Sequence, residues 1–92
     1  MAFARCLGMT PTHTCVYILR SQSNPDRFYT GLTSSLSARL GAHNRGESPH
    51  TASGRPWRLV VSIEFSDAVR AKSFEAYLKT GSGRAFAARH FR

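Results

Sequence analysis

Two tyrosines, an arginine, a histidine and a glutamate are the residues of this chain best suited to chemistry on a phosphate group. Tyr17 and Tyr29 lie on either side of a polar turn, Arg39 and His43 follow with one helical turn between them, and Glu75 comes much later. Hydrolysis of a phosphodiester needs a proton acceptor for the attacking water and positive charge for the phosphoryl oxygens. It also commonly needs a divalent metal ion held by a carboxylate. The set therefore predicts phosphate chemistry if the fold brings the five residues together.

The charge of the chain supports a polyanionic partner. Lysine and arginine number 13 against 5 acidic residues, for a formal net charge of +8, and all but two of the basic residues are arginine. The planar arginine fork matches phosphate in a bidentate way, so we expect contact with nucleic acid. A domain that is merely basic remains the alternative, and charge alone does not predict catalysis.

Length and composition indicate one small globular domain. The 92 residues are 41% hydrophobic, which suits a modest core, and no apolar run approaches the length of a membrane span. We expect residues 1–13 to be a disordered tail, with Met1 or Met9 as the true start, and residues 14–92 to form the domain. Cys6 and Cys15 are expected to be free thiols in a reducing cytoplasm, and the scattered histidines do not predict a zinc site.

Periodicity and breaker residues predict an α+β fold with a small, mainly antiparallel three-stranded sheet flanked by helices, in the order β-β-α-β-α-α. The expected elements are strands at 14–20 and 27–32, a helix at 36–44, a strand at 57–65 and helices at about 68–80 and 82–91. Ser66 or Asp67 is expected to cap the second helix and Gly81 to end it. Gly31, inside a strand, predicts a bulge or a close approach by another group.

The helical spacing places polar groups beside the core. Arg39 and His43 share a predicted face with Leu36 and Leu40, whereas a surface helix would carry them on the opposite side. The second helix has an expected apolar face, with Glu75 at its border; that face consists of Ala68, Ala71, Phe74 and Leu78. A carboxylate near the core is costly without a partner, and a bound cation would be one.

Together these residues resemble the GIY-YIG nuclease family. Cys15-Val16-Tyr17 corresponds to its "GIY" element and Tyr29-Thr30-Gly31 to its "YIG" element, with cysteine in place of glycine and threonine in place of isoleucine. The resemblance covers about residues 14–91 and is nearest to small stand-alone bacterial members, which resemble the nuclease module of the excision-repair subunit UvrC. The ordered set with its spacing carries the resemblance, since each short motif alone is weak.

The resemblance implies a role for each residue. Tyr17 would act as general base or orient the attacking water, and Tyr29 would hydrogen-bond the phosphate or the water. Arg39 would stabilise the charge of the transition state, and His43 would orient Tyr17 or accept its proton. Glu75 would bind Mg²⁺ or Mn²⁺.

The resemblance further implies one close approach and one gap. Gly31 would let the backbone pass close to the site and lie near the nucleic acid. Many members carry a supporting asparagine near the end of the module, for which Ser82 or His90 would have to substitute here.

Further contacts with nucleic acid are expected from the basic residues themselves. Arg84, together with Arg89 and Arg92, is expected to form a basic rim that contacts the nucleic-acid backbone without reading sequence. Lys79 and Arg55 are further candidates for such contacts. Thr51, Arg55 and Trp57 are each expected to be either structural or DNA-facing.

The implied function is a structure-selective DNA endonuclease of DNA repair or processing, acting in the cytoplasm on branched or single-stranded DNA. A partner protein or a homodimer would supply selectivity. The main alternative is a catalytically weak or inactive nucleic-acid-binding module of the same fold; a small protein-interaction domain leaves the arginine excess unexplained. Each residue also has a purely structural interpretation: aromatic packing for the tyrosines, a surface salt bridge for Arg39, a satisfied core histidine for His43 and an ion pair with Lys79 for Glu75.

Overall fold

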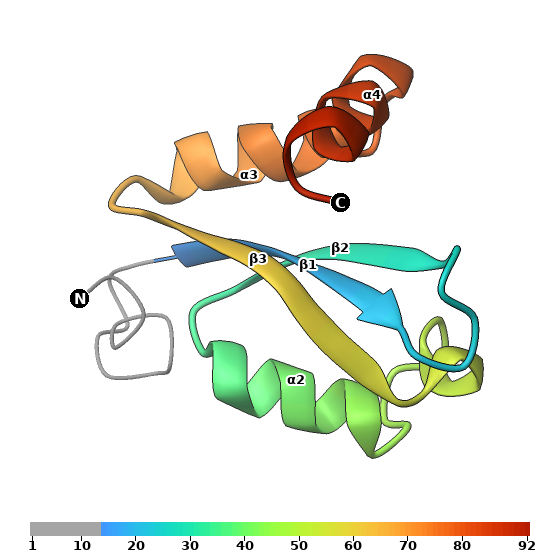
Figure 1. Ribbon diagram of the computed structural model, residues 1–92. Coiled ribbons are helices and arrows are strands. Elements are labelled where there is room, and N and C mark those ends of the chain that lie inside the picture. The colour runs from blue at the N-terminus through green and yellow to red at the C-terminus, as the bar shows by residue number, and fades with distance from the viewer. Residues whose placement is uncertain (1–13) are drawn as a thin grey trace.

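The computed structural model describes residues 14–92, which fold into three layers with the sheet in the middle (Figure 1). One helix covers one face of the sheet, and two helices cover the other. The elements are β1 (Thr14–Ser21), β2 (Phe28–Thr33), α2 (Leu36–Asn44), the short 3₁₀ helix η2 (Ala52–Gly54), β3 (Trp57–Phe65), α3 (Ala68–Leu78) and α4 (Gly81–His90). The predicted α+β class and the order β-β-α-β-α-α are confirmed; η2 was not predicted.

The sheet has the order β2-β1-β3, and both strand pairs are antiparallel. β1 is therefore central, and its apolar residues are buried from both faces. Tyr17 lies opposite Gly31 on β2 and opposite Ser62 on β3. The pairing of β1 with β3 shifts register between Ile18 and Leu19, which increases the local twist of the strands.

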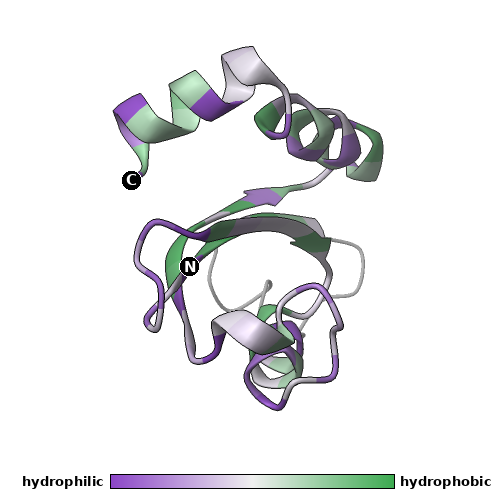
Figure 2. Cartoon of the chain, turned by 90° about the vertical axis from the view of Figure 1, so that its right-hand side faces the viewer, coloured by the Kyte–Doolittle hydropathy of each residue, from purple (hydrophilic) through white to green (hydrophobic). Residues whose placement is uncertain are grey.

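The alternation of side chains along β1 divides the core into two clusters. Odd-numbered β1 residues face α2, where Cys15, Tyr17 and Leu19 pack with Leu36 and Trp57. Even-numbered β1 residues face α3 and α4, in a cluster formed by Val16, Ile18, Ala71, Leu78 and Ala87. Figure 2 shows the hydrophobic strands between the two helical layers and the more hydrophilic loops around them. The sheet thus separates two small cores of different composition.

The helix ends follow from side-chain and backbone capping. The Asp67 carboxylate accepts from the backbone N–H groups of Val69 and Arg70 at the start of α3, as predicted. Gly46, at φ +80°, supplies the left-handed residue after α2. The expectation that Gly81 would end α3 was wrong. Gly81 begins α4, because the Thr80 hydroxyl accepts from Gly83 N–H and caps that helix.

The apolar face of α3 is shorter than expected, because the expectation that Ala68 belongs to it was wrong. Ala68 is exposed, because α3 begins at this residue and lies beyond the edge of the core there. Ala71 and Leu78 are buried and Phe74 is partly buried, as predicted, and Phe86 and Phe91 pack inward from the C-terminal segment.

Cys15 corrects one chemical expectation. It is disulfide-bonded, so the expectation of a free thiol is wrong for this residue. The expectation rested on an assumed reducing compartment, where thiols stay reduced, and on the burial of Cys15. The sequence does not establish that compartment, and burial of the residue does not exclude a bridge. The expectations for residues 1–13 lie outside the described part of the chain. None of the helices in residues 14–92 combines the length and apolar character that a membrane crossing requires.

Candidate active site

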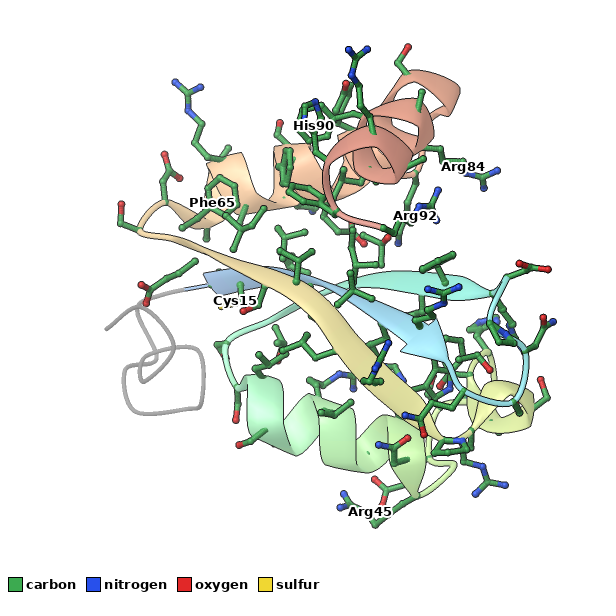
Figure 3. The ribbon with its side chains drawn as sticks, viewed as in Figure 1. Cys15, Arg45, Phe65, Arg84, His90 and Arg92 are labelled. Atoms are coloured by element: carbon green, nitrogen blue, oxygen red, sulfur yellow. The ribbon has the colours of Figure 1, made fainter. Side chains whose placement is uncertain are left out.

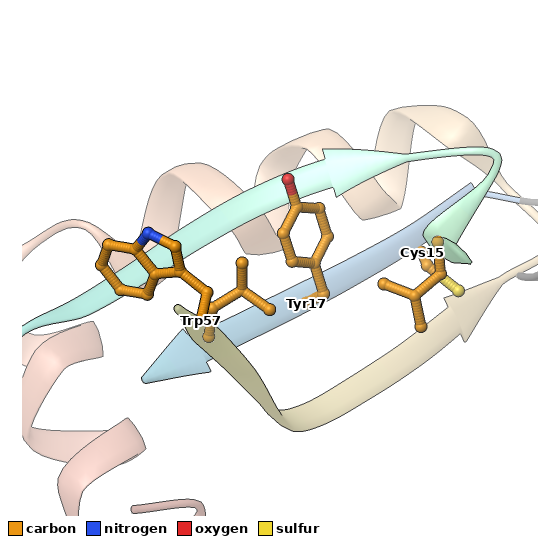
Figure 4. Close-up of a cluster of buried hydrophobic side chains, with 5 residues drawn as sticks. Cys15, Tyr17 and Trp57 are labelled. Carbon is orange, nitrogen blue, oxygen red and sulfur yellow. The ribbon is translucent and has the colours of Figure 1, made fainter. Parts of the chain in front are cut away.

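Tyr17 is the buried centre of the candidate site. Its side chain lies between those of Cys15 and Trp57, with the hydroxyl directed toward β2 (Figure 4). It passes so close to Gly31 that a Cβ at residue 31 would overlap the Tyr17 ring and hydroxyl. Of the two alternatives predicted for Gly31, the structure contains the close approach. Any side chain at residue 31 would therefore displace Tyr17.

Three buried side chains form a hydrogen-bonded chain. The Tyr17 hydroxyl lies 2.9 Å from Nε2 of His43, and Nδ1 of His43 lies 2.7 Å from Oγ1 of Thr51. All three residues are at most 1% exposed. Buried polar groups are costly unless they are hydrogen-bonded, and each member satisfies its neighbour. The chain therefore links β1, α2 and the loop before β3 through one polar path.

The contacts of this path favour one tautomer of His43. A guanidinium only donates, so the Tyr17 oxygen accepts from Arg39 and the Tyr17 proton is left for Nε2 of His43. Nδ1–H then donates to Oγ1 of Thr51, whose own proton has the Ser48 carbonyl, 3.4 Å away, as an acceptor. In this arrangement His43 is a neutral base in contact with the Tyr17 proton.

The loop that carries Thr51 is held by hydrogen bonds from several elements. Trp57 Nε1–H donates to the Thr51 carbonyl at 2.7 Å, and the Ser21 hydroxyl donates to the Gly54 carbonyl at 2.6 Å. The Asn44 side chain bonds both the N–H and the carbonyl of Trp57, at 2.6 and 3.1 Å. The end of α2 is thereby tied to the start of β3, which fixes the position of Thr51 relative to His43.

Sequence reasoning treated Thr51 and Trp57 as structural or DNA-facing, and it did not connect Thr51 with His43. A threonine in a loop carries no periodic signal, and the eight-residue separation from His43 matches no helical contact. The only available hint was a hydroxyl residue soon after a histidine predicted to be buried, in a loop that returns to the sheet.

Arg39 lies at the exposed end of the same polar group. The residue is exposed, not buried with the leucines of α2 as its spacing suggested. Its long side chain nevertheless brings the guanidinium to the Tyr17 hydroxyl, where their hydrogen bond and attraction raise the pKa of Arg39, with a further contribution from Tyr29. The guanidinium is thus both next to Tyr17 and open to solvent, as a phosphate-binding group must be.

Tyr29 completes an aromatic group around the histidine. Its ring centroid lies 4.8 Å from that of His43 and 6.2 Å from that of Tyr17. The edge of the Trp57 ring packs on it at 6.5 Å. Tyr29 is partly exposed, so its ring fixes His43 while one side remains accessible.

Burial controls the proton affinities of the pair. Burial raises the pKa of Tyr17; the hydrogen bond from Arg39 opposes this shift, and the negative charge of Glu75 adds to it. Burial lowers the pKa of His43, and the charge of Arg39 lowers it further. Near neutral pH, Tyr17 is therefore protonated and His43 is neutral, which is the state that a proton relay requires.

Glu75 reaches the site from α3, on the opposite face of the sheet from His43. Its carboxylate is 17% exposed and forms an ion pair with Lys79, with Nζ 2.5 Å from Oε2. The predicted i,i+4 pair is therefore present. It does not exclude a metal ion, because Lys79 contacts Oε2 and the carboxylate has a second oxygen.

A single carboxylate defines the kind of metal site that fits. Among residues 14–92, no group of three or more His, Cys, Asp or Glu side chains could enclose an ion. Mg²⁺ is often bound by one or two carboxylates with water and substrate phosphate as the other ligands. Glu75 suits that arrangement, since it is partly buried and already balanced by a cation. It does not suit a site made of protein ligands alone.

The other predicted contact residues fall in two places. Lys79 and Arg84 line a common pocket beside β2. Arg55 lies apart, where its side chain bonds the Ala52 carbonyl and packs on Gly46. Ser82 and His90 are exposed on α4, and His90 packs on Phe86 at 4.6 Å. The structure thus brings four of the five predicted catalytic residues together, namely Tyr17, Tyr29, Arg39 and His43. Glu75 is near enough for its charge to act on Tyr17, Thr51 joins the site, and Arg55 lies outside it.

Comparison with known proteins agrees with this geometry. A family model described as the GIY-YIG catalytic domain matches residues 13–87. The UPF0213 protein ORF82 of Orgyia pseudotsugata multicapsid polyhedrosis virus is 39% identical over 74 residues, which are 78% of this chain and 69% of that protein.

Two further relatives are structure-specific endonuclease subunits named SLX1. The one from Chaetomium globosum is 38% identical over 71 residues, covering 71% of this chain and 22% of that protein. The one from Scheffersomyces stipitis is 38% identical over 76 residues, covering 75% of this chain and 23% of that protein. The chain therefore spans less than a quarter of either SLX1 subunit.

Proposed function

The chain belongs to the GIY-YIG nuclease superfamily, and we propose that it is a metal-dependent endonuclease that hydrolyses phosphodiester bonds in DNA. The observation that carries the proposal is the hydrogen-bonded path from Tyr17 through His43 to Thr51, with the Arg39 guanidinium at its exposed end. A purely structural set would not need a protonated phenol, a neutral imidazole and a solvent-accessible guanidinium at one point.

The path supports a relay of one proton. The attacking water gives a proton to Oη of Tyr17 while Tyr17 gives its own proton to Nε2 of His43. The phenolate, which burial disfavours, then never accumulates. The imidazolium that forms keeps its Nδ1–H bond to Thr51. Because His43 is neutral near pH 7, it is available as the final acceptor.

Two groups act on the phosphate. Arg39 neutralises charge on the phosphoryl oxygens as the water attacks, which is the kind of stabilisation that commonly dominates phosphoryl transfer. The guanidinium also stays next to the Tyr17 hydroxyl and so links the phosphate to the proton relay. Tyr29, adjacent to both, donates a hydrogen bond to the phosphate or to the water.

Glu75 would hold the metal ion, Mg²⁺ or Mn²⁺, which supplies charge stabilisation for the leaving oxygen when bound. Lys79 shares this carboxylate and holds it in place. The one-carboxylate site leaves most coordination positions to water and substrate, so we expect weak metal binding without DNA.

The printed name of the SLX1 relatives supports a structure-selective substrate, and their designation as subunits supports a partner protein. We propose branched or partly single-stranded DNA as substrate, with selectivity from a partner or a homodimer. We propose a cytoplasmic role in DNA repair or processing, associated with the nucleoid if the source is bacterial.

The test is cleavage of end-labelled branched, single-stranded and duplex DNA with Mg²⁺, Mn²⁺ or EDTA. The informative variants are Glu75→Gln and Tyr17→Phe. Their matched controls are Glu47→Gln, which removes an exposed loop carboxylate, and Tyr77→Phe, which removes an exposed hydroxyl from α3. We expect metal-dependent cleavage that only the first two variants abolish.

Three results would contradict this proposal. Tight DNA binding without cleavage under every metal condition would favour the inactive binding module. Cleavage that survives in EDTA would remove the metal ion from the mechanism. Equal cleavage by Tyr17→Phe and Tyr77→Phe would remove the proton relay.

A further inference from the structure

A pocket of about 400 Å³ opens between β2 and the junction of α3 with α4. Its floor is apolar, formed by Ile18, Leu78 and Ala87, and its wall on β2 includes Phe28 and Tyr29. Tyr29 also belongs to the candidate active site, so the pocket and the site are neighbours. Nothing in the relay from Tyr17 to Thr51 uses this pocket.

The rim of the pocket is basic. Lys79, Arg84 and Arg92 line it together with a single acidic residue, Asp26. Figure 3 shows Arg84 and Arg92 close together on the α4 side, above β2. Within residues 14–92, neither of these two arginines takes part in a salt bridge, whereas Lys79 is paired with Glu75. The pocket therefore has positive charge available for an anion.

Phe28 presents an aromatic face to these cations. The guanidinium of Arg92 lies 4.4 Å from the Phe28 ring centroid, and that of Arg20 lies 5.3 Å from it. The Arg92 guanidinium also donates one long hydrogen bond, 3.4 Å, to the Arg84 carbonyl, and the Arg92 backbone N–H bonds the Ala87 carbonyl at 3.1 Å. Flat, delocalised groups thus pack on the Phe28 ring, and a nucleobase is a group of the same shape that aromatic side chains bind.

The β2 strand connects this ring with the candidate active site. Phe28 and Gly31, which faces the Tyr17 hydroxyl, are three residues apart on β2, a separation of about 10 Å along a β-strand. They face opposite sides of the sheet, because Phe28 packs with the cluster toward α3 and α4, whereas Tyr29 packs with the cluster that contains Tyr17. Since β2 is an edge strand, a DNA strand whose scissile phosphate lies at Arg39 would reach the pocket by passing around this edge, over a few nucleotides at about 3.4 Å each.

We propose that this pocket binds one unpaired nucleotide of the DNA substrate. The base stacks on Phe28, in the place of the Arg92 guanidinium, and Arg84 and Arg92 hold the adjacent phosphate. A pocket of this volume admits one base and not a base pair with its two backbones, so occupancy requires a single-stranded or frayed segment. The inference rests on the proposed nuclease function and names the feature by which that site would select branched DNA.

The experiment measures binding without cleavage. Fluorescence anisotropy in EDTA compares a labelled duplex that carries a single-stranded flap with a fully paired duplex of equal length. We expect wild-type protein to prefer the flap, and Phe28→Leu, which keeps an apolar side chain, to weaken flap binding at least fivefold with duplex binding changed less than twofold. Phe28→Tyr should retain the preference.

Arg84→Gln tests the rim. It should weaken binding and lower the slope of log affinity against log salt by about one. Arg70→Gln is the matched control, because Arg70 is an exposed arginine near the opposite end of α3. Thermal melts confirm that each variant is folded. If Phe28→Leu does not fold, the comparison of DNA binding by Arg84→Gln with that by Arg70→Gln tests the proposal.

The outcomes separate this proposal from the nuclease function. Equal losses on flap and duplex in Phe28→Leu, or equal effects of Arg84→Gln and Arg70→Gln, would overturn the pocket even if the protein cleaves DNA with metal present. A Phe28-dependent flap preference in a protein that never cleaves would support the pocket and count against the nuclease.

Discussion

The two faces of β1 bury different kinds of side chain, although a single eight-residue strand supplies both. The face toward α2 adjoins the buried polar residues Ser21, His43 and Thr51, together with the Tyr17 hydroxyl. The face toward α3 and α4 is an apolar cluster whose charged groups lie at its rim. The α2 face thus carries reactive polar groups within the core, whereas the face toward α3 and α4 has an apolar core with charged groups around its edge.

The difference between the two faces shows where functional groups destabilise the fold. A buried hydroxyl or imidazole destabilises the fold unless it is hydrogen-bonded, so the α2 face keeps its polar groups only in a mutually satisfied path. The rim cations are solvated and need no such path. We therefore expect variants of the α2 face to change cleavage and its pH dependence, and variants of the opposite core to change stability.

The largest expected effect is that of Arg39→Ala, at the exposed end of the polar face. It should lower kcat/KM about 10²–10³-fold, since one group stabilising transition-state charge is worth about 2.7–4 kcal/mol. Urea unfolding should show little change, because the residue is exposed. Arg39→Lys should recover part of the rate, since it keeps the charge and loses the fork. A stability loss as large as the rate loss would make Arg39 structural.

Next is Phe65→Ala in the opposite core, where Phe65 packs on Phe74 at 5.6 Å between ring centroids. Loss of the ring should lower the free energy of unfolding by about 3 kcal/mol, the lower end of the range for aromatic truncation, because Phe65 is only partly buried. The pH profile of cleavage should keep its shape. A displaced pH profile would show that the two faces are not independent.

Thr51→Val should have a smaller effect, which lowers both the free energy of unfolding and the cleavage rate. Valine keeps the volume but leaves Nδ1–H of His43 buried without its acceptor, at a cost of about 1–3 kcal/mol. Urea unfolding measures this loss, and the cleavage rate should fall with it because the His43 proton is no longer confined to Nδ1. Thr51→Ser should restore both. Wild-type behaviour of Thr51→Val would reduce Thr51 to a packing residue.

The smallest expected effect is on the pH dependence of stability, through His43. Its pKa is lowered in the fold by burial and by Arg39, so below the ordinary value of about 6.5 the unfolded chain binds a proton that the folded chain does not. Stability should therefore fall as the pH drops below about 6.5 and level off below the folded pKa.

His43→Gln provides the comparison for this prediction. The glutamine variant does not titrate, so the difference in unfolding free energy between wild type and variant isolates the His43 contribution from those of other histidines. If this difference were independent of pH between 5 and 8, the buried neutral imidazole would be excluded.

Much of the fold was predictable because its signals are local. The span of α2 and that of β3 follow from periodicity and flanking breakers, and both are confirmed as predicted, at 36–44 and 57–65. Period-two alternation also put Tyr17 on one face of β1. Helix ends were less predictable. Gly81 can end one helix or begin another, and the Thr80 hydroxyl decided between them.

The candidate site divides along the same line. The sequence by itself determined which side chains are present and, through helix and strand periods, that Tyr17, His43 and Glu75 adjoin a core. Only the tertiary structure joined His43 to Thr51, gave the exposed Arg39 its contact with the Tyr17 hydroxyl and brought Arg92 onto Phe28. Periodicity reports neighbours within one element. These contacts cross loops between elements, so their existence depends on how the finished layers pack, which no local pattern encodes.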